Sequence, residues 1–151
     1  MMRVYLVIMD ETEEAVRALR FASRRAMKTG GSVHIIALAP RESFNAFGGV
    51  QATIEQEALD RAEMVASSAA GSIFAESGKM PVISVRTGDA QGVIREYLAD
   101  HPEVAALVLG AAGEGSPGPL VAHFSSHIGT LPCPLFIVPG GLTDEDIDRV
   151  S

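Results

Sequence analysis

Two histidines near the end of the chain have a spacing that could serve metal chemistry. His123 and His127 are four residues apart, so on a helix they would share one face and offer two imidazoles to one ion. The sequence shows no recognisable third ligand, and no glutamate directly follows His123 as in the helical zinc motif of hydrolases. We therefore interpret both as helix-surface histidines and expect the protein alone to hold no metal.

The single cysteine, Cys133, lies between Pro132 and Pro134. One cysteine forms no internal disulfide, and its surroundings do not match a redox or metal-ligand spacing. A reactive thiolate needs neighbouring cations that lower its pKa, and none is adjacent in the sequence. We interpret Cys133 as a small buried residue, and we expect a reducing compartment, the cytoplasm.

The sequence contains no complete catalytic arrangement. The chain has no Gly-x-Ser-x-Gly elbow. A nucleotide hydrolase would need a general base and usually a metal beside the phosphates, whereas Asp10, Asp89, Glu114 and the two late histidines form no recognisable pattern. We therefore expect no enzyme, or at most weak nucleotide hydrolysis.

Composition limits the partners of this chain. It has 151 residues, 47% of them apolar, enough for one good core, so we assume one domain. The net charge of −7 repels both a phosphate backbone and an anionic membrane surface. No segment approaches the roughly 20 apolar residues that a membrane-spanning helix needs. We expect neither nucleic acid nor membrane as a partner.

Five apolar segments are predicted as the strands that must position any site. Residues 4–9, 33–39, 104–109 and 135–138 are apolar runs without alternation, which is typical of strands covered on both faces, and residues 81–86 form a shorter candidate. The run at 33–39 stops at a proline, which cannot continue a central strand.

Helical patterns occupy the segments between the strands. Thr12 and Asp89 can cap the first and third helices, and Gly30 can end the first. Helical spacing of apolar residues also predicts helices over 51–75 and about 120–131. We expect a loop at Gly48-Gly49 and, after the domain at 1–140, an acidic tail at 141–151 that is mobile at its end.

Strands that alternate with helices predict a parallel sheet with helices on both faces. Such α/β sheets bind ligands at the carboxyl ends of their strands, where the strand order reverses. Asp10 and Gly110 directly follow the first and fourth predicted strands. They are therefore candidate residues of a ligand-binding site.

Three local patterns, in order along nearly the whole chain, resemble the universal stress protein family. They are the strand ending in Asp10 before a capped helix, the Gly88-Asp89 turn, and the glycine-rich connection that leads from 107–113 to 132–138. The family's Gly-Asp-Pro turn has Ala90 here in place of proline. The resemblance implies a single-domain, Rossmann-like α/β fold with a five-stranded parallel sheet in the order 3-2-1-4-5. It also implies a homodimer formed through the last strand.

In nucleotide-binding members of that family, a loop of Gly, two residues, Gly, nine residues, and Gly followed by Ser or Thr holds the phosphates. Gly110 and Gly113 match its first half. The second half fails, because counting forward places His123 and Phe124 where Gly and Ser would stand. Ser125 and Ser126 could supply hydroxyl donors if the loop is redrawn. The loop is either a rebuilt phosphate loop or a closed one, and the two glycines could simply form the turn after a strand.

By the same resemblance, Asp10 would accept hydrogen bonds from a ribose or adenine, and the backbone at Ala37, Leu38 and Ala39 would line the adenine pocket. Asp10 could instead merely cap the first helix. Phe44 and Phe47 in the following loop could shield a pocket, pack a dimer surface or cover the core.

The leading hypothesis is a homodimeric stress-response or signalling protein that holds an adenine nucleotide, ATP or AMP, at the strand ends. The alternatives are an interaction protein of the same fold that binds no nucleotide, and a weak nucleotide hydrolase. An apolar last strand, 135–138, favours dimerisation because an exposed apolar edge is an aggregation hazard.

Overall fold

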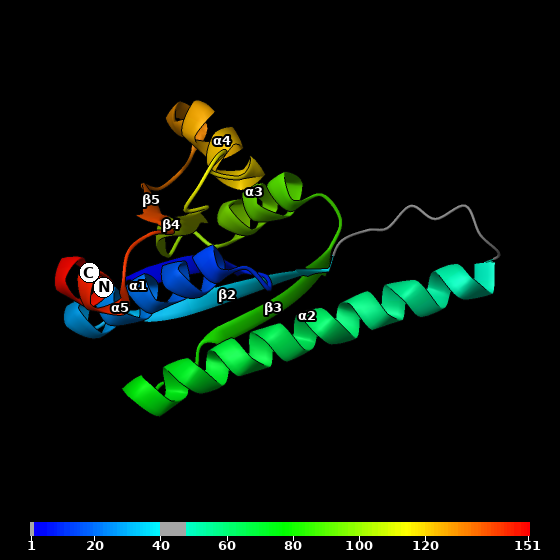
Figure 1. Cartoon of the computed structure of the whole chain (residues 1–151), viewed down its shortest axis with the longest axis horizontal. Helices are drawn as coiled ribbons and strands as arrows, with labels where there is room; N and C mark the ends of the chain where they lie inside the picture. The colour runs from blue at the N-terminus through cyan, green and yellow to red at the C-terminus, as the bar shows by residue number, and fades with distance from the viewer. Residues whose placement is uncertain (1, 40–47) are drawn as a thin grey trace.

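The chain folds around one parallel sheet (Figure 1). The computed structural model describes residues 2–39 and 48–151. The sheet order is β3-β2-β1-β4-β5 and every neighbouring pair is parallel, which confirms the predicted order 3-2-1-4-5. The strands are β1 (Val4–Met9), β2 (Ser32–Ala39), β3 (Val82–Thr87), β4 (Val104–Ala111) and β5 (Leu135–Pro139).

Helices connect the strands as the sequence predicts. They are α1 (Glu13–Thr29), α2 (Gly48–Ser77), α3 (Ala90–Asp100), α4 (Pro119–Ser126) and α5 (Asp144–Val150), with a 3-10 turn at Ile128–Thr130. The predicted caps are confirmed, because the Thr12 hydroxyl accepts a hydrogen bond from the Ala15 amide and the Asp89 carboxylate accepts one from Gly92. Gly30 ends α1 in the left-handed conformation.

Both faces of the sheet are covered, as expected of an α/β fold. One core joins α1, α2 and α5 to the side chains of Tyr5, Val7 and Met9. The other joins α3 and α4 to Val4, Leu6 and Ile8. All six residues of the central strand β1 are buried, and their side chains point alternately into the two cores. Asp10 follows at the carboxyl end of this strand.

Two predicted boundaries are wrong. The loop expected at Gly48-Gly49 is instead the beginning of α2, which Figure 1 shows as one long helix beside β2 and β3. The helix expected over 120–131 is broken: α4 ends at Ser126, and a 3-10 turn follows at Ile128–Thr130. Leu131 is extended, because a residue that precedes proline avoids the helical region. Phe44 and Phe47 lie outside the described residues.

In the acidic tail, residues 144–150 form α5, a helix that the sequence analysis did not predict. Thr143 and Asp146 cap this helix reciprocally, and Ile147 is fully buried against the core that contains α1. The Asp148 carboxylate accepts two hydrogen bonds of 2.8 Å from the Arg20 guanidinium. None of the helices in the described ranges is long and apolar enough to cross a membrane.

Candidate functional site

The carboxyl ends of β1 and β4 lie side by side at the point where the strand order reverses. Asp10 follows β1, and Gly110 lies at the end of β4. Both line one cavity of about 100 Å³, together with Glu14 of α1 and the segment that leads into α4. We call it the Gly110 cavity. Asp10 and Gly110, the two candidate residues from the sequence analysis, therefore line the same cavity.

A second cavity, of about 210 Å³, lies on the other side of Asp10. Leu38 of β2 and Arg61 of α2 line it together with Met9 and Glu11, and we call it the Arg61 cavity. Asp10 lines both cavities. A ligand that occupied both cavities would therefore contact Asp10. We refer to the two cavities together as the Asp10 cleft.

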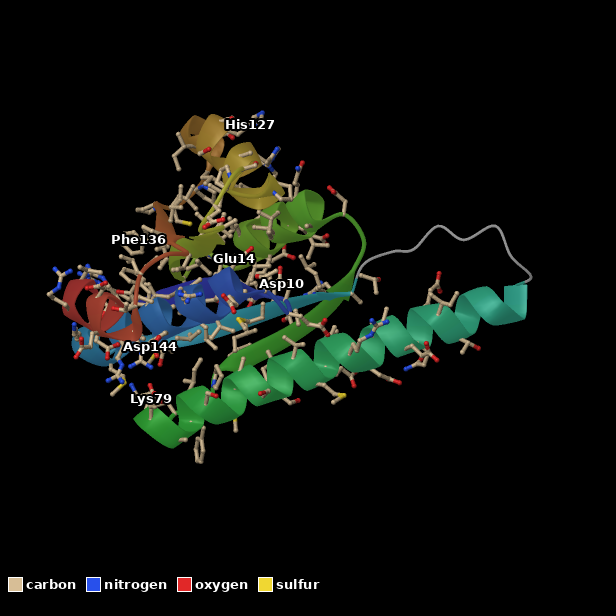
Figure 2. All side chains as sticks on the ribbon, viewed as in Figure 1. Asp10, Glu14, Lys79, His127, Phe136 and Asp144 are labelled. Atoms are coloured by element: carbon tan, nitrogen blue, oxygen red, sulfur yellow. The ribbon has the colours of Figure 1, made fainter. Side chains whose placement is uncertain are left out.

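The Asp10 carboxylate has one oxygen engaged and one available. Its Oδ1 accepts hydrogen bonds from the Thr12 amide, at 2.8 Å, and from the Thr12 hydroxyl. Asp10 therefore holds Thr12, the residue that caps α1, and does not cap the helix itself as the alternative interpretation of Asp10 expected. Its Oδ2 accepts no hydrogen bond from any residue that the structure describes, and the side chain is exposed. Figure 2 shows Asp10 and Glu14 near the beginning of α1.

The glycine-rich connection is folded back on itself. The Ala112 amide donates a hydrogen bond of 3.2 Å to the Pro117 carbonyl, and Gly115 and Gly118 have φ angles of 73° and 107° that favour glycine. Pro117, Gly118 and Pro119 then line the Gly110 cavity. Proline has no amide hydrogen, so this turn offers few donors to a phosphate.

The remaining predicted residues are placed as follows. Ala37 and Ala39 are buried against α2, and of the three β2 residues only Leu38 lines a cavity of the cleft. Gly113 lies beside Gly140, outside the two cavities.

The structure does not bring Ser125 and Ser126 to the cleft. Neither lines its cavities, and both hydroxyls donate to the Ala122 carbonyl on α4. The proposal that they replace the missing Gly-Ser pair is therefore corrected, because helix geometry turns their hydroxyls back onto the backbone.

The two late histidines stack on each other. Their ring centroids are 4.4 Å apart, and His127 Nδ1 lies 2.8 Å from the His123 carbonyl oxygen. Burial and the nearby charges of His127 and Arg95 lower the pKa of His123. The described residues place no third ligand with this pair.

Cys133 is half-buried, and its burial raises the pKa of the thiol. This is the opposite of what activates a cysteine nucleophile. Cys133 packs against the core of α3 and α4, but it is only partly buried rather than buried as the sequence analysis expected.

Sequence reasoning missed two charged residues of the cleft, Glu14 and Arg61. Both had a signal. Glu14 lies in the first turn of the helix that follows Asp10, and Arg61 lies between Ala58, Ala62 and Val65 on the side of α2 that packs on the sheet. A charged residue inside an apolar helical stripe borders a packed surface, here the Arg61 cavity.

The fold and the cleft define a doubly wound α/β protein with its candidate binding site at the switch point of the strand order. The sequence profile of the Universal stress protein family matches residues 1–139. The chain belongs to this family. No curated protein matches it.

Solved structures agree with the fold. A universal stress protein UspA from Lactobacillus plantarum has 18% identity and a TM-score of 0.77, covering 90% of this chain and 97% of the other. A protein from Archaeoglobus fulgidus in complex with dAMP has 19% identity and a TM-score of 0.59, with coverage of 91% and 98%. One from Arabidopsis thaliana with AMP bound has 14% identity and a TM-score of 0.59, with coverage of 91% for both chains.

Proposed function

We propose that this protein is a homodimeric stress-response or signalling module that binds an adenine mononucleotide in the Asp10 cleft. The observation that carries the proposal is the position of Asp10, which lines both cavities and keeps one carboxylate oxygen available. A carboxylate in this place suits the hydroxyls of a ribose, because it accepts strong hydrogen bonds from them. The similar structures in complex with dAMP and AMP support the same ligand class.

The cleft favours a nucleotide with few phosphates over ATP. Asp10 and Glu14, two acidic residues, line the Gly110 cavity, and no lysine or arginine is among the residues that line it. Arg61, on the other side of Asp10, is the cation of the Arg61 cavity. Each further phosphate adds negative charge near these carboxylates. The lost Gly-Ser pair removes the amides and hydroxyl that would offset that repulsion.

We also propose that the module is not an enzyme, or at most hydrolyses nucleotides weakly. Asp10 could act as a general base, but phosphoryl transfer also needs cations that offset the charge of the phosphates. No lysine, arginine or histidine is among the residues that line the Gly110 cavity. Ligand occupancy would then act by changing the surface that a partner protein meets.

The dimer part of the proposal rests on the edge strand. Among the described residues β5 pairs only with β4, and Ile137 of β5 exposes 41% of its surface. An apolar edge strand is protected when a second copy pairs with it.

A second candidate, an interaction protein that binds no nucleotide, is favoured by the small size of the Gly110 cavity. Its volume of about 100 Å³ lies below the roughly 300 Å³ at which small-molecule sites begin, although a wider cavity of about 440 Å³ is lined by Asp10 and Arg61 beside α2. Pro117, Pro119 and Val121 occupy part of the space beside Gly110, as this candidate requires. A mononucleotide would have to span both cavities across Asp10.

Calorimetric titration of the purified chain with AMP, cAMP and ATP tests the choice between these candidates. We expect AMP to bind more tightly than ATP. Asp10→Asn keeps an oxygen acceptor for Thr12. It should lower the affinity for AMP by about tenfold, as expected for a lost hydrogen bond to a charged group. Asp100→Asn, on the exposed end of α3, is the matched control and should bind like the wild type. No heat of binding at millimolar AMP would favour the interaction protein instead.

A further inference from the structure

A cluster of aromatic and charged side chains lies at the amino ends of the strands, whereas the Asp10 cleft lies at their carboxyl ends. His34 is near the amino end of β2, Tyr97 is in the last turns of α3, and His101 is the residue at which that helix ends. Glu103 follows, just before β4. Because α3 packs on the sheet and returns the chain to the amino end of β4, its last turn meets the beginning of β2. We call these four residues the His34 cluster.

Hydrogen bonds and ring stacking hold the cluster together. His34 Nδ1 lies 2.7 Å from the Tyr97 hydroxyl, and the rings of Tyr97 and His101 stack with centroids 4.0 Å apart. His101 Nδ1 lies 2.7 Å from a carboxylate oxygen of Glu103. One ring nitrogen of each histidine and one Glu103 oxygen all lie within 4.8 Å of one another.

We propose that His34, His101 and Glu103 bind a divalent transition-metal ion of the Zn²⁺ type. Two imidazoles and a carboxylate are a familiar zinc ligand set, with ligand distances of about 2.0–2.2 Å and a fourth position open to water. Ligand atoms in such a tetrahedron are roughly 3.4 Å apart, so the cluster must tighten slightly on binding. The side chains of His101 and Glu103 are 32% and 44% exposed and can make that movement.

His34 is the fixed ligand of the site. It is 8% exposed, and the Tyr97 hydroxyl fixes its ring through Nδ1, as second-sphere groups do for metal-bound histidines. Its Nε2 makes no hydrogen bond to any residue in the described ranges.

The charges around the cluster favour a cation. Glu103 supplies a carboxylate whose pKa is lowered by its hydrogen bond from His101. The end of α3 adds the partial negative charge of a helix carboxyl terminus. The stacked pair His123 and His127 lacks these features: Arg95 Nη2 lies 3.5 Å from His123 Nε2, and no carboxylate joins the pair among the described residues.

The proposed metal site is independent of the proposed nucleotide site. It lies at the opposite ends of the strands and shares no residue with the two cavities of the Asp10 cleft. It also runs against the expectation, drawn from the sequence, that the protein holds no metal. His34 and His101 are far apart in the sequence, and their ligand geometry exists only once α3 has packed against β2.

Titration of the untagged, EDTA-treated full chain with Zn²⁺ by calorimetry tests the proposal. We expect one ion per chain and a thermal midpoint that rises with Zn²⁺ concentration, since a ligand that binds the folded state stabilises it. Mg²⁺ should have no such effect, because it prefers oxygen ligands. Co²⁺ in place of Zn²⁺ should give the visible absorption of a tetrahedral site.

Variants locate the ion. His101→Ala and Glu103→Gln change half-exposed side chains, so both variants should fold. Each should lower the affinity for Zn²⁺ by more than tenfold. Tyr97→Phe should weaken it less and shift the pH profile of binding, because it frees the His34 ring without removing a ligand. The double variant His123→Ala/His127→Ala is the matched control and should bind like the wild type. A wild type that binds no Zn²⁺, or binding that survives His101→Ala but is lost in the control, would overturn the proposal.

Discussion

Gly110 in β4 packs directly against the backbone of Glu14 in the first turn of α1. A β-carbon at position 110 would overlap the Glu14 carbonyl group far inside van der Waals contact. This glycine is therefore required for the close approach of helix and sheet, whether or not a phosphate binds beside it. The same approach makes Glu14 one of the residues that line the Gly110 cavity.

Gly110→Ala should destabilise the fold by about 1–3 kcal/mol, as expected when an extra carbon is forced into a packed site. The clash is with backbone, which cannot rotate away as a flexible side chain can. Urea denaturation measures the loss. Gly129→Ala is the control, since a β-carbon there meets nothing within 4 Å, and equal stability of the two variants would refute the packing role.

Glu14→Gln should improve ATP binding relative to AMP by about threefold or more, because it removes one negative charge from the Gly110 cavity. Competition calorimetry with the two nucleotides gives the ratio. Glu13→Gln is the neighbouring control, since Glu13 is exposed and pairs with Arg17 outside the cleft. An unchanged ratio in Glu14→Gln would show that this carboxylate does not meet the phosphates.

Ile147→Ala should cost about 2–5 kcal/mol of unfolding free energy, because Ile147 is fully buried and the deletion leaves a cavity. Val150→Ala, at a position 48% exposed in the same helix, should cost under about 0.5 kcal/mol. Chemical denaturation of both variants checks the difference. Similar small losses would mean that α5 contributes little to the fold.

The docking of α5 on α1 should weaken in acid. The hydrogen bonds from Arg20 hold the pKa of Asp148 below its usual value of 3.8. The unfolded chain therefore takes up this proton first as the pH falls. The contribution is complete above about pH 5 and is lost as the pH drops through the folded-state pKa. Melting curves from pH 5 to pH 3 should show this loss, and Asp148→Asn should show a smaller decline than the wild type.

Ile137→Lys should convert the proposed dimer to monomers, because it puts a charge on the exposed edge of β5. Sedimentation at micromolar concentration measures the state. Val82→Lys makes the same change on β3, the other edge strand, where Val82 is 50% exposed, and it should leave the dimer intact. A wild type that sediments as a monomer contradicts the dimer proposal itself.

Local patterns were enough to predict most of the fold. The unbroken apolar runs became the strands, and Thr12 and Asp89 cap the helices that they were predicted to cap. These features depend on neighbours a few residues away, so they can be read from the chain. The resemblance to universal stress proteins supplied the strand order, which no local pattern contains.

The prediction of the site was less complete. Asp10 and Gly110 were paired correctly because the ends of neighbouring parallel strands must meet. Ser125 and Ser126 were misplaced, because the helical geometry of α4 turns their hydroxyls onto the Ala122 carbonyl. Arg61 was missed because its place at the cleft depends on how α2 lies along the sheet.

The sequence by itself determined the five strands, the caps of α1 and α3 and the residues at the strand ends, since these follow from short-range propensity and hydrophobic pattern. Only the tertiary structure decided that the acidic tail docks on α1 through Arg20 and Asp148, and that His34 meets His101 and Glu103. These contacts join residues far apart in the sequence, and their geometry arises when helices pack on the sheet.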